Sequence, residues 1–273
     1  ELEQEDTSII SGYCSMRELC EKHCILYIPF TKINKDNHVE LLGKLKPDVF
    51  FAVGLSQLIS EDLLKIAKLG NIGFHPTLLP RGRGRAPIAW LLLNEEQGAA
   101  NFFLMGKGAD DGPVFIQEPF DVTDKDNASS IEYKILNSIK IALDKWLPNL
   151  KRGEWNPIPQ HELFVTYYGK RAPEDGWINW ETSNAQIDKL IRASAQPHPG
   201  AYSFINSKKI TVLRSRLENN IPIKGVTGRV LLVNAQHEYL IQCGIGHVWI
   251  SEIYYDNKAI ELKVGQKLGY YGE

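Results

Sequence analysis

The chain has 273 residues, 43% of them hydrophobic and 23% charged, and its 31 basic and 33 acidic side chains give a formal net charge of -2. This profile is typical of a globular protein with one large and one smaller domain. It excludes the global positive field that would collect nucleic acid or an anionic membrane surface. No apolar stretch approaches the length of about 20 residues that spans a bilayer.

The cysteines indicate a reducing compartment. Three of the four, Cys14, Cys20 and Cys24, lie in the first 24 residues with no secretory signal ahead of them. This arrangement predicts free thiols and a cytoplasmic protein. The letters of CEKHC resemble a metal motif, but a second pair of ligands is missing, so we expect no metal site.

Helices and strands alternate along the first half of the chain. Apolar runs predict strands at residues 24–29, 49–53, 71–75, 101–106 and 113–120, and periodic segments between them predict helices. The last helix of this half covers residues 129–150. This order predicts an α/β domain with an open, mainly parallel, Rossmann-like sheet.

The pattern changes after KRGEWNPIPQ, a segment rich in proline, glycine and charge at residues 151–160. One helix, at residues 184–195, is followed by several short strands with glycine turns. Such strands predict a small C-terminal β-barrel, OB-like in size. We expect a catalytic domain over 1–155, a linker over 156–174 and the barrel over 175–273.

A histidine and an aspartate fall at the edge of the sheet where ligands bind. His75 ends a predicted strand, where Pro76 interrupts the ladder, and Asp110 lies in the glycine-flanked loop GKGADDG before the strand at 113–120. Ligands of open α/β sheets bind beyond the carboxyl ends of the strands. A carboxylate beside an imidazole orients the ring and makes it a better general base. The sequence therefore predicts a His75–Asp110 pair.

The segment HPTLLPRGRGRAPIAW, followed by GADDGPVF, resembles the signature of the formyltransferases that depend on 10-formyltetrahydrofolate. PEDGWINW and LIRASAQPHPGAY are similar to the hinge and C-terminal domain of the same family, so the likeness runs from about Ser15 to the C-terminus. It implies that His75 is the catalytic histidine and Asp110 its aspartate. Together they would manage the proton lost when an amine attacks the formyl carbon, while Asp111 falls on a variable position.

The resemblance also implies where the co-substrate 10-formyltetrahydrofolate binds. Main-chain groups of the loop VGLSQLI would hold the pterin ring, and the loop from Met105 to Asp111 would close the other side of the pocket. The expected folate-binding residues are Val53, Leu55, Gln57, Leu58, Ile59, Met105 and Gly108.

One position departs from the family pattern. The transferases place an asparagine two residues before the histidine, where its amide stabilises the oxyanion, and here that position is Gly73. Asn71 lies roughly 13 Å from His75 along a strand, beyond hydrogen-bond reach. Loss of one oxyanion donor costs on the order of 100-fold in rate. Hydrolase relatives also lack the asparagine, so 10-formyltetrahydrofolate hydrolysis stays open.

The start of the chain also departs from the family, whose members begin with a strand, a glycine-bearing loop and a helix. Here the chain opens on ELEQEDTSII, without an initiator methionine. Since that first strand is central to the family's sheet, and its loss would expose two strand edges, we expect that residues before this point are omitted.

The arginine-rich loop indicates the acceptor. An arginine at the position of Arg85 resembles the sugar-nucleotide enzymes, and guanidinium groups can hold a diphosphate through paired hydrogen bonds. The expected substrate-binding residues are Arg81, Arg83, Arg85 and Trp90. We therefore expect formyl transfer to the amine of a nucleotide-linked amino sugar, of the kind made for surface polysaccharides.

Three other functions stay open. Methionyl-tRNA formylation is disfavoured because basic residues of the C-terminal domain are diluted by acidic ones, so we expect no nucleic-acid partner. Hydrolysis of the folate and binding of ligands without turnover are the others. An apolar C-terminal sheet favours a homodimer, and we expect no membrane partner.

Overall fold

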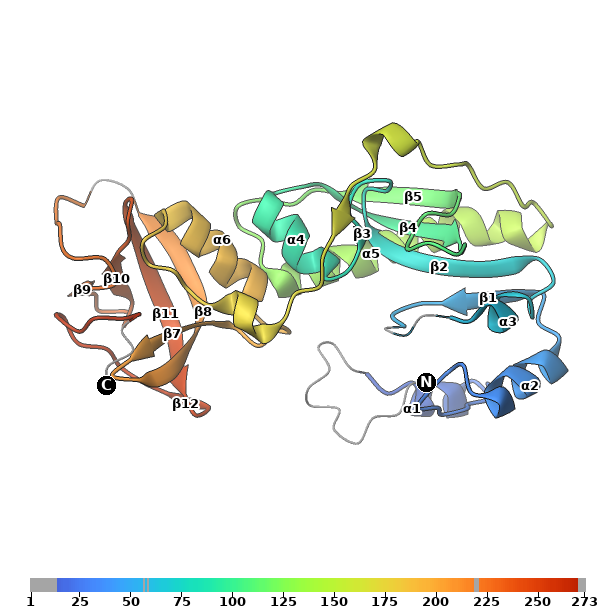
Figure 1. Cartoon of the computed structure of the whole chain (residues 1–273), viewed down its shortest axis with the longest axis horizontal. Helices are drawn as coiled ribbons and strands as arrows, with labels where there is room; N and C mark the ends of the chain where they lie inside the picture. Colours follow the sequence, from blue (N-terminus) through green and yellow to red (C-terminus); the bar gives the residue numbers. More distant parts are fainter. Residues whose placement is uncertain (1–13, 56, 58, 219–220, 270–273) are drawn as a thin grey trace. The chain divides into compact units, whose positions relative to one another are not determined.

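The computed structural model describes residues 14–55, 57, 59–218 and 221–269 (Figure 1). Its contacts define two compact units that interleave along the chain. The first contains the described residues up to Gly84, together with Ala99–Phe120 and Asn137–Tyr167; the second contains Arg85–Gly98, Asp121–Leu136 and the residues from Tyr168 onward. The domain boundaries near residues 155 and 175 stay a prediction.

The first unit is built on a four-stranded sheet of order β1-β2-β4-β5. The strands are β1 (Val49–Ala52), β2 (Gly70–Thr77), β4 (Gly98–Leu104) and β5 (Val114–Phe120). β1 and β2 are parallel, with Val49 opposite Gly70. A second, two-stranded sheet pairs β3 (Arg83–Gly84) with β6 (Tyr167–Tyr168).

The sheet is mixed rather than mainly parallel, which corrects the expectation from the sequence. The amide of Met105 donates to the carbonyl of Asn71, while the side chain of Asn101 reaches the carbonyl of His75, so β4 runs opposite to β2. The amide of Leu104 donates to the carbonyl of Pro113, which closes the loop between β4 and β5. This loop is shorter than the dozen or so residues that a parallel crossover needs, so the two strands are antiparallel neighbours.

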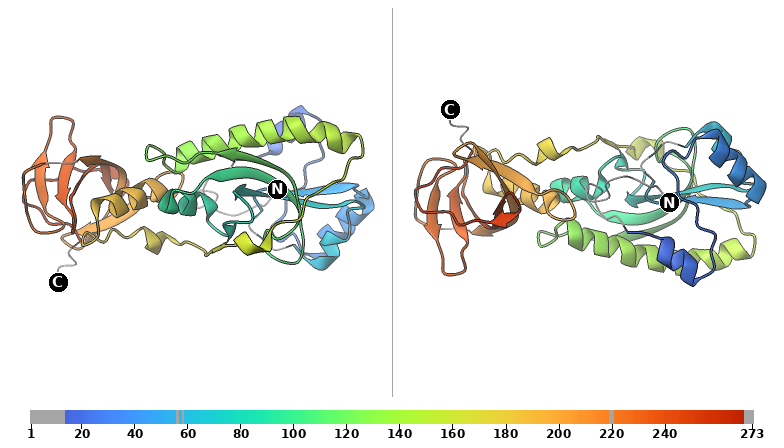
Figure 2. Two further views of the ribbon diagram at one scale, coloured as in Figure 1. Left: turned by 90° about the horizontal axis from the view of Figure 1, so that it is seen from above. Right: turned by 90° about the horizontal axis from the view of Figure 1, so that it is seen from below.

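One face of the sheet is apolar and packs against a helix, whereas the other face carries His75. Ile72 and Phe102 pack against Trp146 of the long helix α5 (Ala128–Lys151), and the rings of Phe102 and Trp146 stack with centroids 5.6 Å apart. Figure 2 shows α5 running alongside the sheet strands. Because side chains alternate along a strand, Gly73 and His75 point to the face opposite Ile72. Burial of the apolar face thus leaves the other face for polar residues.

Three short helices, α1 (Arg17–Lys22), α2 (Asp36–Leu45) and α3 (Glu61–Leu64), complete the first unit. The strand expected at residues 24–29 does not form: no strand is assigned between α1 and α2, and Ile25 and Leu26 are 58% and 67% exposed. The segment has irregular backbone instead.

The second unit has a six-stranded sheet covered by a helix. The sheet order is β7-β8-β11-β10-β9, with β12 paired to β11, and each of these pairs is antiparallel. Its elements are α4 (Pro87–Asn94), α6 (Asn184–Ser194), β7 (Ala201–Ile205), β8 (Lys208–Glu218), β9 (Val230–Val233), β10 (Tyr239–Gln242), β11 (His247–Tyr255) and β12 (Lys258–Ala259).

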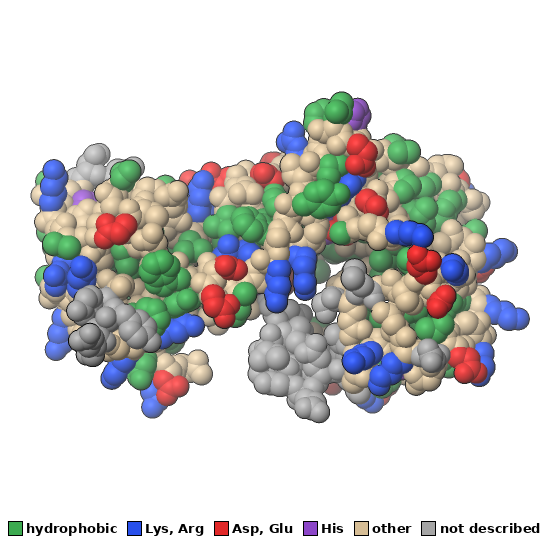
Figure 3. Space-filling model, viewed as in Figure 1, with side chains coloured by type: hydrophobic (Ala, Val, Ile, Leu, Met, Phe, Trp, Pro, Cys, Tyr) green, Lys and Arg blue, Asp and Glu red, His purple; other side chains and the backbone are tan. Residues whose placement is uncertain are grey.

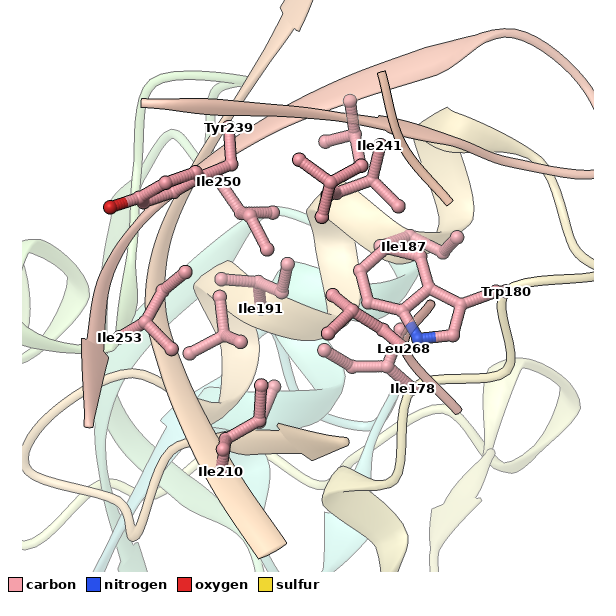
Figure 4. Packing of buried hydrophobic residues seen from close by; sticks show 14 of the residues in the cluster. Ile178, Trp180, Ile187, Ile191, Ile210, Tyr239, Ile241, Ile250, Ile253 and Leu268 are labelled. Carbon is pink, nitrogen blue, oxygen red and sulfur yellow. The ribbon is translucent and has the colours of Figure 1, made fainter. Parts of the chain in front are cut away.

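An apolar core packs α6 against the sheet of this unit (Figure 4). Ile187 and Ile191 of α6 face Ile210, Ile241 and Ile250 of the sheet, and all five side chains are nearly or fully buried. The indole of Trp180 lies in the same core and donates to Ser203 Oγ at 2.9 Å. Trp180 therefore has a packing role in this unit.

The second sheet stays open, so the expected OB-like barrel is not found. β7 and β9 are its two edges, and across the described residues they do not pair with each other. Irregular segments cover both edges instead: Ile178 donates its amide to Tyr202, and Val230 donates its amide to Gln266. A barrel requires the edge strands to hydrogen-bond to each other, whereas covering them is another way to protect exposed edges.

None of the described helices is both long and apolar enough to cross a membrane.

Candidate active site

His75 lies near the carboxyl end of β2 and is 5% exposed. Its Nε2 is 2.8 Å from the carbonyl oxygen of Gly82, and its Nδ1 is 3.4 Å from Oδ2 of Asp110. A carbonyl oxygen can only accept, so Nε2 carries the hydrogen in this contact. This leaves Nδ1 and the carboxylate of Asp110 facing each other. The structure brings the two residues together, and their catalytic role stays a prediction.

The loop before β5 holds Asp110 in place. Asp110 has a φ of +52°, in the left-handed region, and its Oδ2 also accepts from the amide of Gly84 at 2.9 Å. The side-chain amide of Gln160 donates to the carbonyls of Asp110 and Gly112, each at 2.7 Å. Left-handed backbone is rare for residues other than glycine, so these contacts must keep Asp110 in it.

Asp111 has a different environment from Asp110. Its carboxylate lies over Gly106 and Gly108. A Cβ added to Gly108 would lie 2.2 Å from Asp111 Oδ2. A Cβ on Gly112 would lie 1.6 Å from the carbonyl oxygen of Leu104. The loop therefore needs glycine at position 112, where the close atom belongs to the backbone, whereas at position 108 the exposed side chain of Asp111 can move away.

The space beside Gly73 is occupied by neighbouring side chains. A Cβ at this position would lie 2.6 Å from Phe103 Cζ and 3.1 Å from Met105 Cγ. Both residues come from β4 or the loop that follows it. No larger side chain fits at position 73 unless the Phe103 ring moves.

Asn71, which precedes Gly73 on the same face of β2, is 3% exposed. Its Nδ2 donates to the carbonyl of Leu64, and its Oδ1 has no hydrogen-bond partner in the described residues. The amide is therefore directed to α3 and does not take over the role expected at position 73.

The residues expected to bind folate lie in two loops. The side chain of Gln57 accepts from the amide of Ile33 at 2.9 Å and donates to the carbonyl of Thr31 at 2.8 Å, so it is occupied within the protein. Val53 is 53% exposed, Leu55, Ile59 and Met105 are half-buried, and Gly108 is exposed. Leu58 lies outside the described residues. An ion pair of 2.9 Å between Lys107 and Glu61 joins the second loop to α3.

The arginines of the loop after β2 have different surroundings. Arg81 and Arg85 are exposed, and their side chains form no hydrogen bond or ion pair within the described ranges. Arg83 is 1% exposed, and its guanidinium donates to Gln160, Glu162 and Tyr167. Burial lowers the pKa of Arg83, but the hydrogen bonds and charges of Glu162 and Tyr167 outweigh it, so the net shift is upward. Buried and fully engaged, Arg83 does not suit the expected role in substrate binding.

Trp90 is half-buried in an aromatic cluster of the second unit. Its ring stacks on Tyr168 with centroids 5.6 Å apart, its Nε1 donates to the carbonyl of Gly169, and the guanidinium of Arg171 lies 5.5 Å from its ring centre. Burial raises the pKa of Tyr168 to about 12, and its hydrogen bond with Glu96 and the charge of that residue act in the same direction. The ring of Trp90 is thus in contact with other protein groups, and its expected role in substrate binding stays a prediction.

Two residues of the site carry no local signal in the sequence. Gln160 lies in the proline-rich segment interpreted as a linker, and Phe103 lies in an apolar run typical of any core strand. Both matter only through contacts with residues distant in the chain.

The comparisons agree with the motifs. Residues 15–146 match the family described as "Formyl transferase", and residues 170–263 match "Formyl transferase, C-terminal domain". The chain is 35% identical over 206 residues to the bifunctional polymyxin resistance protein ArnA of Wigglesworthia glossinidia brevipalpis, which covers 75% of this chain and 32% of that protein.

Solved structures share the fold. A variant of HypX from Aquifex aeolicus aligns with a TM-score of 0.69 and 22% identity, over 90% of this chain and 43% of that one. The N-formyltransferase from Helicobacter canadensis, solved with folinic acid and dTDP-3-aminofucose, aligns with a TM-score of 0.67 and 17% identity, over 92% and 87% of the two chains. The chain spans about a third of the ArnA relative and less than half of HypX. With both domain matches in place, the chain belongs to the formyl transferase family.

Proposed function

We propose that this chain transfers a formyl group from 10-formyltetrahydrofolate to the amine of a nucleotide-linked amino sugar. The observation that carries the proposal is the buried His75–Asp110 pair, with 3.4 Å between Nδ1 and Oδ2, in a chain of the formyl transferase family. The pair lies at the sheet edge where α/β proteins bind their ligands.

The contacts of His75 suggest how the proton moves. The amine nitrogen attacks the formyl carbon, a new C–N bond forms, and the bond from that carbon to N10 of the folate breaks. Because the Gly82 carbonyl holds Nε2–H, the proton released by the amine is received at Nδ1, beside the carboxylate of Asp110. The same proton then goes to N10 of the departing tetrahydrofolate. Such general base catalysis contributes about 10²- to 10⁴-fold in rate.

Two loops are suited to the folate. In our proposal the pterin ring lies between the loop at residues 53–59 and the loop at residues 105–111. The ion pair of Lys107 with Glu61 connects the second loop to the helix that follows the first. The Helicobacter canadensis enzyme was solved with folinic acid, which supports a folate as the formyl donor.

The acceptor is proposed from the exposed arginines. Arg81 and Arg85 have guanidinium groups without protein partners in the described residues, as a diphosphate site requires. The same Helicobacter canadensis structure contains dTDP-3-aminofucose, and the ArnA relative is a polymyxin resistance protein. We leave Arg83 out of the substrate site because of its burial. Trp90 stays in the proposed site as a prediction from the sequence.

A tRNA acceptor has less support. On the face drawn in Figure 3, Lys and Arg side chains are scattered among Asp and Glu rather than gathered in one patch. In the second unit, Arg214 pairs with Glu252 and Arg216 pairs with Glu238, so their charges are partly neutralised. Phosphate contacts supply most of the affinity for nucleic acid, and paired arginines supply little of it.

Hydrolysis of 10-formyltetrahydrofolate is the second candidate, and Gly73 favours it. Water would then attack the formyl carbon, and formate and tetrahydrofolate would leave. Because Phe103 fills the space beside Gly73, no side chain at that position can donate to an oxyanion.

One assay separates the candidates. Release of tetrahydrofolate from 10-formyltetrahydrofolate is followed with and without a panel of dTDP- and UDP-linked amino sugars, using the wild-type chain and His75→Ala. Amine-dependent release that is lost in His75→Ala supports the transferase and identifies its acceptor. Release without any amine supports the hydrolase, and no release with any sugar contradicts the proposal and leads to methionyl-tRNA as the next substrate.

A further inference from the structure

The loop after β2 contains a buried arginine that the proposed reaction does not use. Arg83 is 1% exposed, and Gln160 Oε1 accepts from both its Nε and its Nη2, at 3.1 and 3.0 Å. Its Nη2 also donates to Glu162 at 2.9 Å, and its Nη1 donates to Tyr167 at 3.3 Å. A buried guanidinium is expensive to desolvate and is kept where its hydrogen bonds are satisfied.

The two neighbours of Arg83 in the chain both contact the candidate catalytic pair. On one side, the carbonyl of Gly82 accepts from Nε2 of His75 at 2.8 Å. On the other side, the amide of Gly84 donates to Oδ2 of Asp110 at 2.9 Å. Three consecutive residues therefore have linked contacts: Gly82 binds the ring of His75, Gly84 binds the carboxylate of Asp110, and Arg83 between them holds the loop in place.

Glycines alone would not hold this geometry. Gly82 and Gly84 have φ angles of +71° and +112°, values that glycine adopts at little cost but that it also leaves easily. The amide of Gly82 has one further contact, with Thr166 Oγ1 at 2.8 Å. The backbone of Arg83 ties the loop to the segment at residues 160–167, because its amide donates to the carbonyl of Thr166 at 3.0 Å. The side chain of Arg83 adds contacts with Gln160, Glu162 and Tyr167 of the same segment.

Gln160 extends the same connection to the other loop. Its Oε1 accepts from Arg83, while its Nε2 donates to the carbonyls of Asp110 and Gly112, each at 2.7 Å. One side-chain amide thus links the loop that holds His75 to the loop that carries Asp110.

We propose that Arg83 and Gln160 are positioning residues: they set the relative placement of His75 and Asp110, and so the rate of the chemical step, without touching substrate. The effect on rate rests on the proposed function, whereas the effect on geometry does not. Misplacement of reacting groups by about 1 Å costs on the order of 100-fold in rate.

The variants are Arg83→Lys, which keeps the charge but loses the paired hydrogen bonds, and Gln160→Glu, which keeps the acceptor but loses the two donors. Glu162→Gln is the matched control, because Glu162 contacts the same guanidinium but its side chain is 73% exposed. We expect Arg83→Lys and Gln160→Glu to lower kcat at least about tenfold, with KM for the folate and the amine unchanged within about twofold. Glu162→Gln should stay within about twofold of wild type in both constants.

A second measurement does not depend on activity. The NMR signal of the His75 ring reports its surroundings, and we expect it to shift in Arg83→Lys and Gln160→Glu but not in Glu162→Gln, with thermal unfolding used to show that each variant is folded. If the wild-type chain releases no tetrahydrofolate, the proposed function fails. The NMR comparison then decides by itself whether Arg83 and Gln160 position His75. An unmoved His75 signal in both variants overturns the inference, as does a change in KM with kcat intact.

Discussion

A Cβ added to Gly73 would lie 2.6 Å from Cζ of Phe103, a distance that real Cβ atoms essentially never show. The ring of Phe103 is 3% exposed and cannot swing into solvent without losing its packing. The phenylalanine ring at position 103 therefore requires glycine at position 73. An asparagine at position 73 would clash with this ring.

Gly73→Ala tests this requirement. The added methyl group must displace the Phe103 ring, and overpacking of this kind costs about 1 to 3 kcal/mol of unfolding free energy. Urea denaturation of the variant should show that loss, and adding Phe103→Leu should recover part of it. Gly43→Ala is the control, because nothing lies within 4 Å of its Cβ position and alanine favours helix α2. Equal stability of Gly73→Ala and wild type would contradict the requirement.

Asp110→Asn tests the candidate catalytic pair. The amide keeps the size of the carboxylate but removes the charge that faces Nδ1 of His75. We expect kcat for formyl transfer to fall by about 10²- to 10⁴-fold. Asp111→Asn is the matched control on the next residue, where the carboxylate lies over Gly108. A larger loss in Asp111→Asn than in Asp110→Asn would reverse the assignment.

Arg81→Ala and Arg85→Ala test the proposed diphosphate site. A hydrogen bond to a charged group contributes about 1.5 to 3 kcal/mol, so each change should raise KM for the nucleotide sugar roughly 10- to 100-fold. The KM for 10-formyltetrahydrofolate should not change. Arg152→Ala, an exposed arginine paired with Glu154, serves as the control. Unchanged KM in both loop variants would place the diphosphate elsewhere.

The pair of Glu238 with Arg216 predicts a dependence of stability on pH. Hydrogen bonds from Arg216 lower the pKa of Glu238 below its ordinary 4.5, against an opposing effect of burial, and Asn234 adds to the lowering. A carboxyl group whose pKa is lower in the folded state stabilises the protein above its unfolded pKa and loses that contribution as the pH falls through the folded value. Because Arg216 is 42% exposed on its side chain, the contribution is below about 1 kcal/mol.

Thermal unfolding of wild type and Glu238→Gln between about pH 3 and pH 7 measures this contribution. The variant should be slightly less stable at neutral pH, and the difference should disappear toward pH 3. Glu174→Gln, at an exposed position without an ion pair in the described residues, is the comparison. A stability difference that grows on acidification would contradict a lowered pKa of Glu238 in the folded state.

Local signals account for what the sequence predicted well. Asp110 among glycines marks a loop, a feature that depends on residues adjacent in the chain. His75 lies near the carboxyl end of a strand as predicted, but β2 continues through Pro76 to Thr77 and does not end at His75. The strands and helix of the second unit follow from alternation and periodicity, which act over a few residues. The family motifs are equally local, and the domain matches confirm them.

Only the tertiary structure decided the rest, because it depends on contacts between distant residues. Arg83 lies in the same alternation of arginine and glycine as Arg81 and Arg85, but Gln160, 77 residues away, accepts hydrogen bonds from its guanidinium in a buried position. The apolar run at residues 24–29 has the composition of a strand, but its backbone is irregular in the structure. The direction of β4 and the ring beside Gly73 were likewise set by packing across the sheet, where local propensity has no influence.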